Sequence, residues 1–192
     1  MTCEYEYEAI EIPCLQQEII NVFVAGDEHS GKCSLIKVFT NSEIEKTNNE
    51  LKCVVECLYT LESSTAFLRI WYVQNLYGAM EDLKEICNHQ KSVILFCYSR
   101  NCIDTLVNLL VQWIPEIKEQ IGTSVPGLLV ETENNLTISE SRCQFFGIKH
   151  FSSLEDEPSV MLRLHLNGFL RCSINDVTSV EKVFRAAVTF AS

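Results

Sequence analysis

The chain has 192 residues, of which 47% are hydrophobic, and a formal net charge of −11 from 26 acidic and 15 basic residues. This size and apolar content suffice for one hydrophobic core and are short for two, so we expect a single domain. The acidic balance argues against a sequence-independent attraction to nucleic acid or to an anionic membrane surface. Basic or neutral protein surfaces suit the chain better as partners.

The ten cysteines are scattered along the chain and form no C-x-x-C pair. The first eight residues are acidic and polar, unlike the basic and then apolar start of a secretory signal. We therefore expect reduced thiols, a cytoplasmic protein and no structural metal site. The apolar runs are far shorter than the roughly 20 residues that cross a bilayer, so direct membrane insertion is not expected.

The N-terminal residues 1–18 form an acidic arm with little hydrophobic periodicity, and we expect one domain over residues 19–192. At its start, a continuous apolar run at 19–25 predicts a buried strand. The segment 32–39, which follows a glycine-containing loop, predicts a helix. Strand, loop and helix are therefore expected to follow one another directly.

The rest of the chain alternates between strand and helix periodicity. Two runs at 53–61 and 66–73, joined by a short polar turn, predict an antiparallel pair of strands. The remaining segments predict three buried strands and two helices, namely strands at 92–98, 125–131 and 168–173 and helices at 104–121 and 176–191. This order predicts an α/β fold: a six-stranded, mostly parallel sheet with one antiparallel edge strand and helices on both faces.

The loop between the first predicted strand and the first predicted helix reads GDEHSGK and carries Gly26, Gly31 and Lys32. A glycine-rich turn in this place directs backbone N–H groups and the positive end of the helix at a phosphate, and the lysine neutralises the outer phosphates. The same residues can also persist for folding alone, with Lys32 capping carbonyls or pairing with Glu28. The loop therefore predicts a fold and leaves phosphate binding open.

Two long stretches beyond the loop match a known family. Residues 92–130 run from a buried strand through a helix with a W-x-P-E motif into the next strand. Residues 171–188 contain Cys172 and Ser173 directly before the last helix. Together with the loop, these stretches resemble the small GTPases of the Ras superfamily, and the Rho branch in particular.

The resemblance covers roughly residues 19–190 and implies the Ras-like P-loop fold. It also implies a Rho-type insert at about 137–168, with its helix within 156–166, because the interval before Ser173 is longer than Ras or Rab members need. Such a protein would bind GTP or GDP with magnesium and would act through protein partners. Those functions depend on the residues that hold nucleotide and metal.

The positions that hold magnesium in the family depart from its pattern. Cys33 stands where members carry a serine or threonine hydroxyl, and a neutral thiol is a poor ligand for a hard cation. Ser34 follows, but its side chain points about 100° further around the helix. Tyr72 stands where the aspartate of the D-x-x-G box holds the metal through water. We therefore expect no magnesium site.

The positions around the γ-phosphate depart from the pattern as well. Glu28 replaces a glycine, and a carboxylate about 4 Å from a phosphate charge costs roughly 4 kcal/mol at an effective dielectric near 20. Asn75 replaces the glycine of the D-x-x-G box, and Leu76 replaces the glutamine that orients the attacking water. The threonine of switch one would fall near Glu50 or Leu51. We expect no catalytic residue and no GTP hydrolysis.

The guanine-reading N-K-x-D box is replaced by Thr132, Glu133 and Asn135 in the sequence LLVETENNL. Asn135 accepts one hydrogen bond from the guanine edge where an aspartate accepts two, and Glu133 reverses the charge of the lysine. Buried groups left unpaired cost about 1–3 kcal/mol each, so guanine selectivity should be lost. Of the C-S-A box, Ser173 remains, while Ile174 replaces the alanine.

Three functions stay open, of which the least favoured is a hydrolase that uses His29 or Glu28 in new roles. The favoured one is a Rho-like pseudo-GTPase that binds little or no nucleotide or magnesium and serves as a scaffold for protein partners in small-GTPase-type signalling. The alternative is a divergent GTPase that still binds GTP or GDP and switches slowly. Its nucleotide would rest on the loop residues, namely Gly26, Glu28, His29, Ser30, Gly31, Lys32, Cys33 and Ser34.

Two questions about the surface follow from the resemblance. Tyr72 and Tyr77 occupy the segment of switch two, where they either form a new recognition surface or fill the space that nucleotide and metal would take. The last residues read VTFAS, without the C-a-a-X cysteine of most Rho proteins, so no prenylation is expected.

Overall fold

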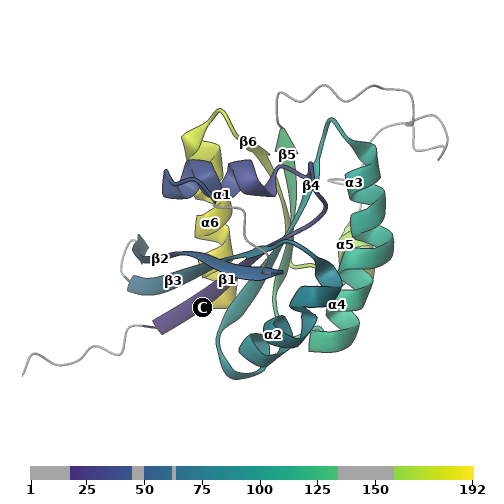
Figure 1. The fold of residues 1–192 in the computed structure, drawn as a ribbon, viewed down its shortest axis with the longest axis horizontal. Helices are drawn as coiled ribbons and strands as arrows, with labels where there is room; N and C mark the ends of the chain where they lie inside the picture. Colours follow the sequence, from purple (N-terminus) through teal and green to yellow (C-terminus); the bar gives the residue numbers. More distant parts are fainter. Residues whose placement is uncertain (1–17, 45–49, 62–63, 134–157) are drawn as a thin grey trace, which may run out of the picture.

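A computed structural model describes residues 18–44, 50–61, 64–133 and 158–192. In these residues, six strands form one sheet in the order β2-β3-β1-β4-β5-β6, and helices cover both of its faces (Figure 1). The strands are β1 (Glu18–Ala25), β2 (Leu51–Leu61), β3 (Ser64–Val73), β4 (Ser92–Ser99), β5 (Gly127–Glu133) and β6 (Gly168–Ser173). The helices are α1 (Lys32–Thr40), α2 (Leu76–His89), α3 (Ile103–Asn108), η1 (Leu109–Trp113), α4 (Ile114–Ile121), α5 (Pro158–Arg163) and α6 (Val177–Ala191).

The sheet is parallel except at one edge. Strand β1 pairs in parallel with both β3 and β4, and β4, β5 and β6 continue in parallel. The edge strand β2 pairs antiparallel with β3. The predicted α/β sheet with one antiparallel edge strand is confirmed. The predicted N-terminal arm lies outside the described residues except for Glu18, which begins β1 and was wrongly placed in the arm. Helix α5 lies where the insert helix was expected, at 156–166, and the part of the insert before it lies outside the described residues.

Two helical features differ from the sequence expectation. Helix α2 was not anticipated, although it spans Leu76–His89. The single helix expected over 104–121 contains a π-helical segment, η1, between α3 and α4. A π segment inserts a wider turn into a helix and rotates the side chains that follow it, and such segments are frequent at functional sites. No helix within the described ranges combines the length and the apolar character needed to cross a membrane.

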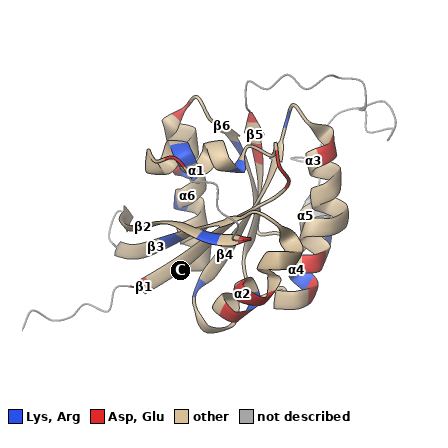
Figure 2. Ribbon diagram, viewed as in Figure 1, with Lys and Arg blue, Asp and Glu red and all other residues tan. Residues whose placement is uncertain are grey.

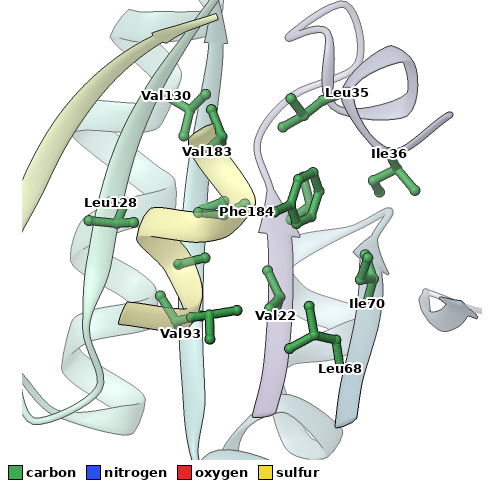
Figure 3. Close-up of a cluster of buried hydrophobic side chains, with 14 of the residues drawn as sticks. Val22, Leu35, Ile36, Leu68, Ile70, Val93, Leu128, Val130, Val183 and Phe184 are labelled. Atoms are coloured by element: carbon green, nitrogen blue, oxygen red, sulfur yellow. The ribbon is translucent and has the colours of Figure 1, made fainter. Parts of the chain in front are cut away.

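One face of the sheet packs against α1 and α6. Figure 3 shows Phe184 of α6 among Val22 of β1 and Leu35 and Ile36 of α1, and these four side chains are fully buried. Phe184 also stacks on Phe39, with ring centroids 3.8 Å apart. Burying an aliphatic or aromatic side chain of this size contributes about 1.5–3 kcal/mol, so this cluster holds α1, and the loop before it, against the sheet.

The opposite face packs against α2, α3, η1 and α4. Its core contains Phe23 of β1, Phe96 of β4, Leu76 of α2 and Trp113 of η1, each no more than 5% exposed. These contacts hold α2, η1 and the helices next to them against this face of the sheet. Both faces of β1 are therefore covered, which agrees with its continuous apolar sequence.

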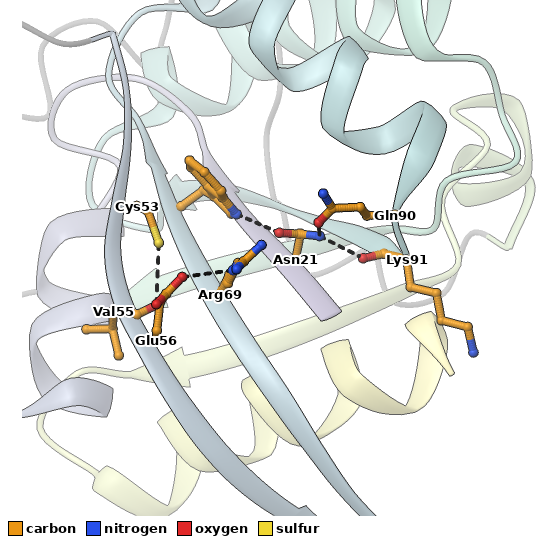
Figure 4. A network of polar contacts seen from close by, with 8 residues as sticks. Asn21, Cys53, Val55, Glu56, Arg69, Gln90 and Lys91 are labelled. Carbon is orange, nitrogen blue, oxygen red and sulfur yellow. Dashed lines mark hydrogen bonds and ion pairs between the residues drawn. The ribbon is translucent and has the colours of Figure 1, made fainter. Parts of the chain in front are cut away.

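A fully buried asparagine in β1 has all its side-chain groups paired. The amide nitrogen Nδ2 of Asn21 donates to Gln90 Oε1 at 2.9 Å and to the Lys91 carbonyl at 3.2 Å, as Figure 4 shows. Its oxygen Oδ1 accepts a hydrogen bond from Trp71 Nε1 at 2.9 Å. Paired in this way, the polar group costs little inside the core, and it joins β1 to β3 and to the segment before β4.

A second buried polar network crosses β4, β5 and β6. The hydroxyl of Tyr98 donates to Glu131 Oε2 at 2.6 Å, and Arg171 Nε lies 3.2 Å from Glu131 Oε1. The three residues are neighbours in the strand registers, and Tyr98 and Glu131 are almost fully buried. Burial, followed by the hydrogen bond to Glu131, raises the pKa of Tyr98.

We expect this network to weaken at alkaline pH. Because the pKa of Tyr98 is raised above its ordinary value of about 10, its protonated form stabilises the fold below pH 10. That contribution is lost as the pH rises further, because ionisation of the tyrosine then favours the unfolded chain. Urea unfolding between about pH 8 and 11 should show a steeper loss of stability for the natural protein than for Tyr98→Phe. An equal dependence of stability on pH in the two proteins would contradict the role assigned to Tyr98.

Candidate functional site

Folding by itself requires glycine at both glycine positions of the loop from residue 26 to residue 31. Gly26 has φ of 139° and Gly31 has φ of 82°, in the region that favours glycine. A Cβ atom on Gly26 would lie 2.3 Å from the Cys97 carbonyl oxygen, and one on Gly31 would lie 2.2 Å from Thr132 Oγ1. The conformation of the loop and its packing on β4 and β5 therefore account for both glycines without any ligand.

Lys32 hydrogen-bonds back to its own loop. Its Nζ atom donates to the carbonyls of Gly26 at 2.7 Å and Asp27 at 2.8 Å, and the residue is 3% exposed. Burial lowers the pKa of Lys32. Glu28 is exposed and forms no ion pair with Lys32 in the described part of the chain. The sequence left several roles open for Lys32, and in this structure its side chain caps backbone carbonyls.

Tyr72 packs against the same lysine. The Lys32 ammonium lies 5.2 Å from the centroid of the Tyr72 ring, within the range of a cation–π interaction. Burial raises the pKa of Tyr72, and a hydrogen bond with the Cys33 side chain raises it further. The ring is half-buried. Tyr72 thus packs beside the loop, and both interpretations of its role stay predictions.

The donor atoms in this region do not fit magnesium. Cys33 presents an exposed thiol at the start of α1, and Tyr72 presents an aromatic ring where the family has a carboxylate. A hard cation prefers carboxylate, carbonyl and hydroxyl oxygens. Ser34 is half-buried on the first turn of α1. No group of three or more His, Cys, Asp or Glu side chains among the described residues could hold a metal ion.

Asp27 ties the loop to the helices on the other side. Its Oδ1 accepts a hydrogen bond from Trp113 Nε1 at 2.7 Å, and its Oδ2 accepts one from Asn108 Nδ2 at 2.6 Å. The π segment η1 ends at Trp113 and thereby contributes one of the two donors. Asp27 was not among the sequence candidates, although the aspartate and the W-x-P-E motif were both visible. Their pairing depends on the fold.

Thr132 holds the loop from β5. Its hydroxyl is fully buried and donates to the Ser30 carbonyl at 2.7 Å, with the Tyr98 carbonyl at 3.1 Å as a second acceptor. The threonine at the first position of the base-reading box thus has a structural partner in the loop. The Ser30 hydroxyl is buried and has no hydrogen-bond partner among the described residues.

The other base-box positions lie further out. Glu133 is exposed, with its Oε1 4.0 Å from Arg100 Nη1. Ser173 pairs with Glu133 in the β5–β6 register, and its backbone is bonded to the Ser179 hydroxyl at 3.1 and 2.8 Å. The structure therefore brings Thr132, Glu133 and Ser173 to one end of the sheet. Asn135 lies outside the described residues, so its predicted role stays a prediction.

The segment of switch two begins a regular, capped helix. Asn75 Oδ1 accepts hydrogen bonds from the backbone N–H groups of Tyr77 at 3.0 Å and Gly78 at 3.5 Å, which is the arrangement of a helix N-cap. Leu76, at the position of the water-orienting glutamine, is 4% exposed in the core beneath α2. The side chain at that position points into the core and away from solvent.

Restoring the glutamine at this position should therefore destabilise the protein. Leu76→Gln places a polar amide in an apolar site, and we expect the free energy of unfolding to fall by about 2–3 kcal/mol. Glu81→Gln at an exposed position of the same helix is the control and should change it by less than about 0.5 kcal/mol. Urea unfolding measures both variants. A Leu76→Gln protein as stable as the natural one would show that the side chain can turn outwards.

An open pocket lies between the loop and the start of α3. Its lining residues are Asp27, Glu28, His29, Cys102, Asp104 and Thr105. Three of these carry carboxylates, which repel an anionic phosphate chain. His29 is exposed and has φ of 58°, so it contributes a polar loop position in left-handed backbone. The pocket beside the loop is therefore lined mainly by negative charge.

Comparison with known proteins agrees with the geometry of the fold. A model of the Ras family matches residues 21–191. The Rho-related protein racL of Dictyostelium discoideum is 24% identical over 89% of this chain and 88% of its own length. The human Rho-related GTP-binding protein RhoB is 27% identical over 88% of this chain and 86% of its own length. The chain belongs to the Ras family and, within it, is similar to the Rho-related small GTPases.

Proposed function

We propose that this protein is a Rho-like pseudo-GTPase, which binds protein partners as a constitutive scaffold and neither hydrolyses GTP nor depends on nucleotide or magnesium. The observation that carries the proposal is the position of Lys32. Its ammonium is bonded to the carbonyls of Gly26 and Asp27 and covered by the Tyr72 ring. An ammonium carries three N–H donors; two of them are used within the loop, and an aromatic ring stands beside it where the family has a metal-holding carboxylate.

The substitutions around the loop support the same conclusion. Cys33 supplies a thiol in place of a hard oxygen ligand, and Glu28 adds a negative charge beside the loop. Leu76 is buried where a catalytic glutamine would face the γ-phosphate. Leu76 packs in the core, and the loop keeps its shape through the contacts of Lys32, Asp27 and Thr132 within the chain.

One observation favours the alternative of a slowly switching GTPase. The strand, the glycine loop and the helix N-terminus are retained, and human RhoB, at 27% identity, is by name a GTP-binding protein. Backbone N–H groups at a helix N-terminus attract phosphate whatever the side chains are. Such binding would be weak and unselective, because base and metal contacts supply most of the specificity.

Thermal unfolding with added ligands separates the two functions. A ligand that binds the folded state stabilises it and thereby raises the temperature midpoint of unfolding. The stabilisation is about 2.7 kcal/mol when the free ligand is at one hundred times its dissociation constant. We expect no shift with millimolar GTP, GDP or ATP, with or without magnesium, while human RhoB serves as the positive control. A magnesium-dependent shift that prefers guanine over adenine nucleotides would overturn the proposal.

The proposal also places the protein in the cytoplasm. Seven cysteines among the described residues are free thiols, and four of them are half-buried and one is exposed. Free thiols at this density suit a reducing compartment. Fractionation of cells that express the tagged chain would test this, and recovery in a secreted or luminal fraction would contradict it.

A further inference from the structure

The residues at the start of β2 lie against the first turn of α2. The carbonyl of Glu50 accepts a hydrogen bond from the backbone N–H of Gln74 at 2.8 Å, just before α2 begins. Leu51, the first residue of β2, is 9% exposed and belongs to the same buried cluster as Leu76, the first residue of α2. A backbone hydrogen bond and apolar packing therefore join the two segments within the chain.

The side chain of Glu50 crosses α2 at a glycine. A Cβ atom on Gly78 would lie 2.4 Å from Glu50 Cγ, 2.9 Å from its Cβ and 3.0 Å from its Cδ. Turning the Glu50 side chain away would relieve the contacts with Cγ and Cδ, but its Cβ atom is fixed by the backbone. Any residue larger than glycine at position 78 would therefore push the backbone at Glu50 away from α2.

The backbone of α2 does not by itself require glycine at this position. Gly78 lies in the first turn of the helix and is not among the described glycines with positive φ. Glycine within a helix lowers the equilibrium constant for folding about two- to fivefold relative to alanine. The chain thus carries a helix-weakening residue at the position where Glu50 needs the space.

The carboxylate of Glu50 also suits the end of α2 on which it lies. The N-terminal end of a helix carries a partial positive charge and favours a nearby carboxylate. Helix α2 has no acidic residue in its first turn, and its own carboxylates, drawn red in Figure 2, lie in later turns. Glu50 therefore supplies, from outside the helix, the negative charge that the first turn lacks.

We propose that Glu50 and Gly78 form a latch that holds the end of switch one on switch two without nucleotide. In GTPases the γ-phosphate and magnesium order these two segments, which are released after hydrolysis. In this chain Glu50 and Gly78 make the contact themselves, so the face that the two segments share keeps one shape. The inference rests on the proposed scaffold function and supplies its conformational basis.

Amide hydrogen exchange of Gly78→Ala tests the latch without nucleotide. The readout is the Gln74 N–H, because its acceptor is the Glu50 carbonyl. We expect this amide to exchange about tenfold faster in the variant, since the added Cβ displaces Glu50. The Ile94 N–H of β4, which donates to the Pro126 carbonyl at 2.9 Å, is the reference in the same sample. Its rate should change by less than about threefold, because the opening is local.

Two further variants separate the displacement of Glu50 from helix propensity. Asn88→Ala raises the propensity at an exposed position near the other end of α2 and should leave Gln74 exchange within about twofold. Adding Gly78→Ala to Glu50→Gly, which lacks the atoms that the new Cβ would meet, should raise the folding equilibrium constant about two- to fivefold. The latch is wrong if Gly78→Ala gives this same gain in the natural chain and leaves Gln74 exchange unchanged.

Adding GTP and magnesium to the exchange experiment separates the latch from the proposed function. Exchange of the natural protein that is unchanged by nucleotide agrees with both. If nucleotide slows exchange in the loop from residue 26 to residue 31 while Gly78→Ala still frees Gln74, the latch stands and the nucleotide-free scaffold is wrong. If nucleotide has no effect and Gly78→Ala does not free Gln74, the latch is wrong and the proposed function stands.

Discussion

Replacing Lys32 with methionine is expected to lower the free energy of unfolding of the nucleotide-free protein by about 2–4 kcal/mol. Methionine keeps an apolar stem but no ammonium, so the carbonyls of Gly26 and Asp27, which accept from Lys32 at 2.7 and 2.8 Å, lose their donor. A buried acceptor left unpaired costs about 1–3 kcal/mol. The burial cost of the ammonium, visible in its lowered pKa, offsets part of this loss.

Lys37 on the same helix is the matched control. Its side chain is 54% exposed and forms an ion pair with Glu43. Exposed pairs contribute about 0–1 kcal/mol, so Lys37→Met should leave stability almost unchanged. Urea unfolding at pH 7 without nucleotide compares the two variants. If Lys32→Met is as stable as Lys37→Met, the lysine does not hold the loop, and its role lies elsewhere.

Glu131→Ala is expected to lower the free energy of unfolding by about 3 kcal/mol. The change removes the acceptor of the Tyr98 hydroxyl at 2.6 Å and the partner of Arg171 at 3.2 Å, and leaves a cavity. Breaking a buried charge pair costs about 3–5 kcal/mol when the remaining charge is buried. The lower value applies here because the Arg171 side chain is 44% exposed and regains water.

The control for this prediction is two residues along the same strand. Glu133 has a side chain that is 57% exposed and lies 4.0 Å from Arg100. Glu133→Ala should therefore change stability by less than about 0.5 kcal/mol in the same urea titration. A second variant, Tyr98→Phe with Glu131→Leu, removes both buried polar partners and should recover much of the loss. If Glu131→Ala is as stable as Glu133→Ala, the network does not stabilise the fold.

The strands could be predicted because buried parallel strands leave continuous apolar runs. Helix α2 could not, because its buried stripe has three members, Leu76, Ala79 and Leu83, and Gly78 interrupts a helical pattern. Its N-terminal signal, Asn75 before an apolar residue, was interpreted as a broken D-x-x-G box. The residues that replaced the motif are the ones that begin the helix.

The candidate site could be predicted in its residues but not in its contacts. The sequence located the loop, the thiol Cys33 and the tyrosine at position 72. It left two roles for Lys32, because the choice depends on where its Nζ atom lies relative to the loop carbonyls. The Asp27 contacts to Asn108 and Trp113 join residues about 80 positions apart. Such pairs follow from strand order and helix packing, which no local pattern contains.

The nucleotide content of the purified protein tests the scaffold function most directly. The protein is denatured without any prior chelation or exchange, and the supernatant is separated on an ion-exchange column against GTP and GDP standards. We expect no nucleotide above the level of a Lys32→Met preparation, because a thiol at Cys33, an aromatic ring at Tyr72 and a carboxylate at Glu28 replace the family's metal and phosphate contacts. Stoichiometric GTP or GDP would contradict this expectation, since the changed metal, γ-phosphate and base positions would then not prevent tight nucleotide binding.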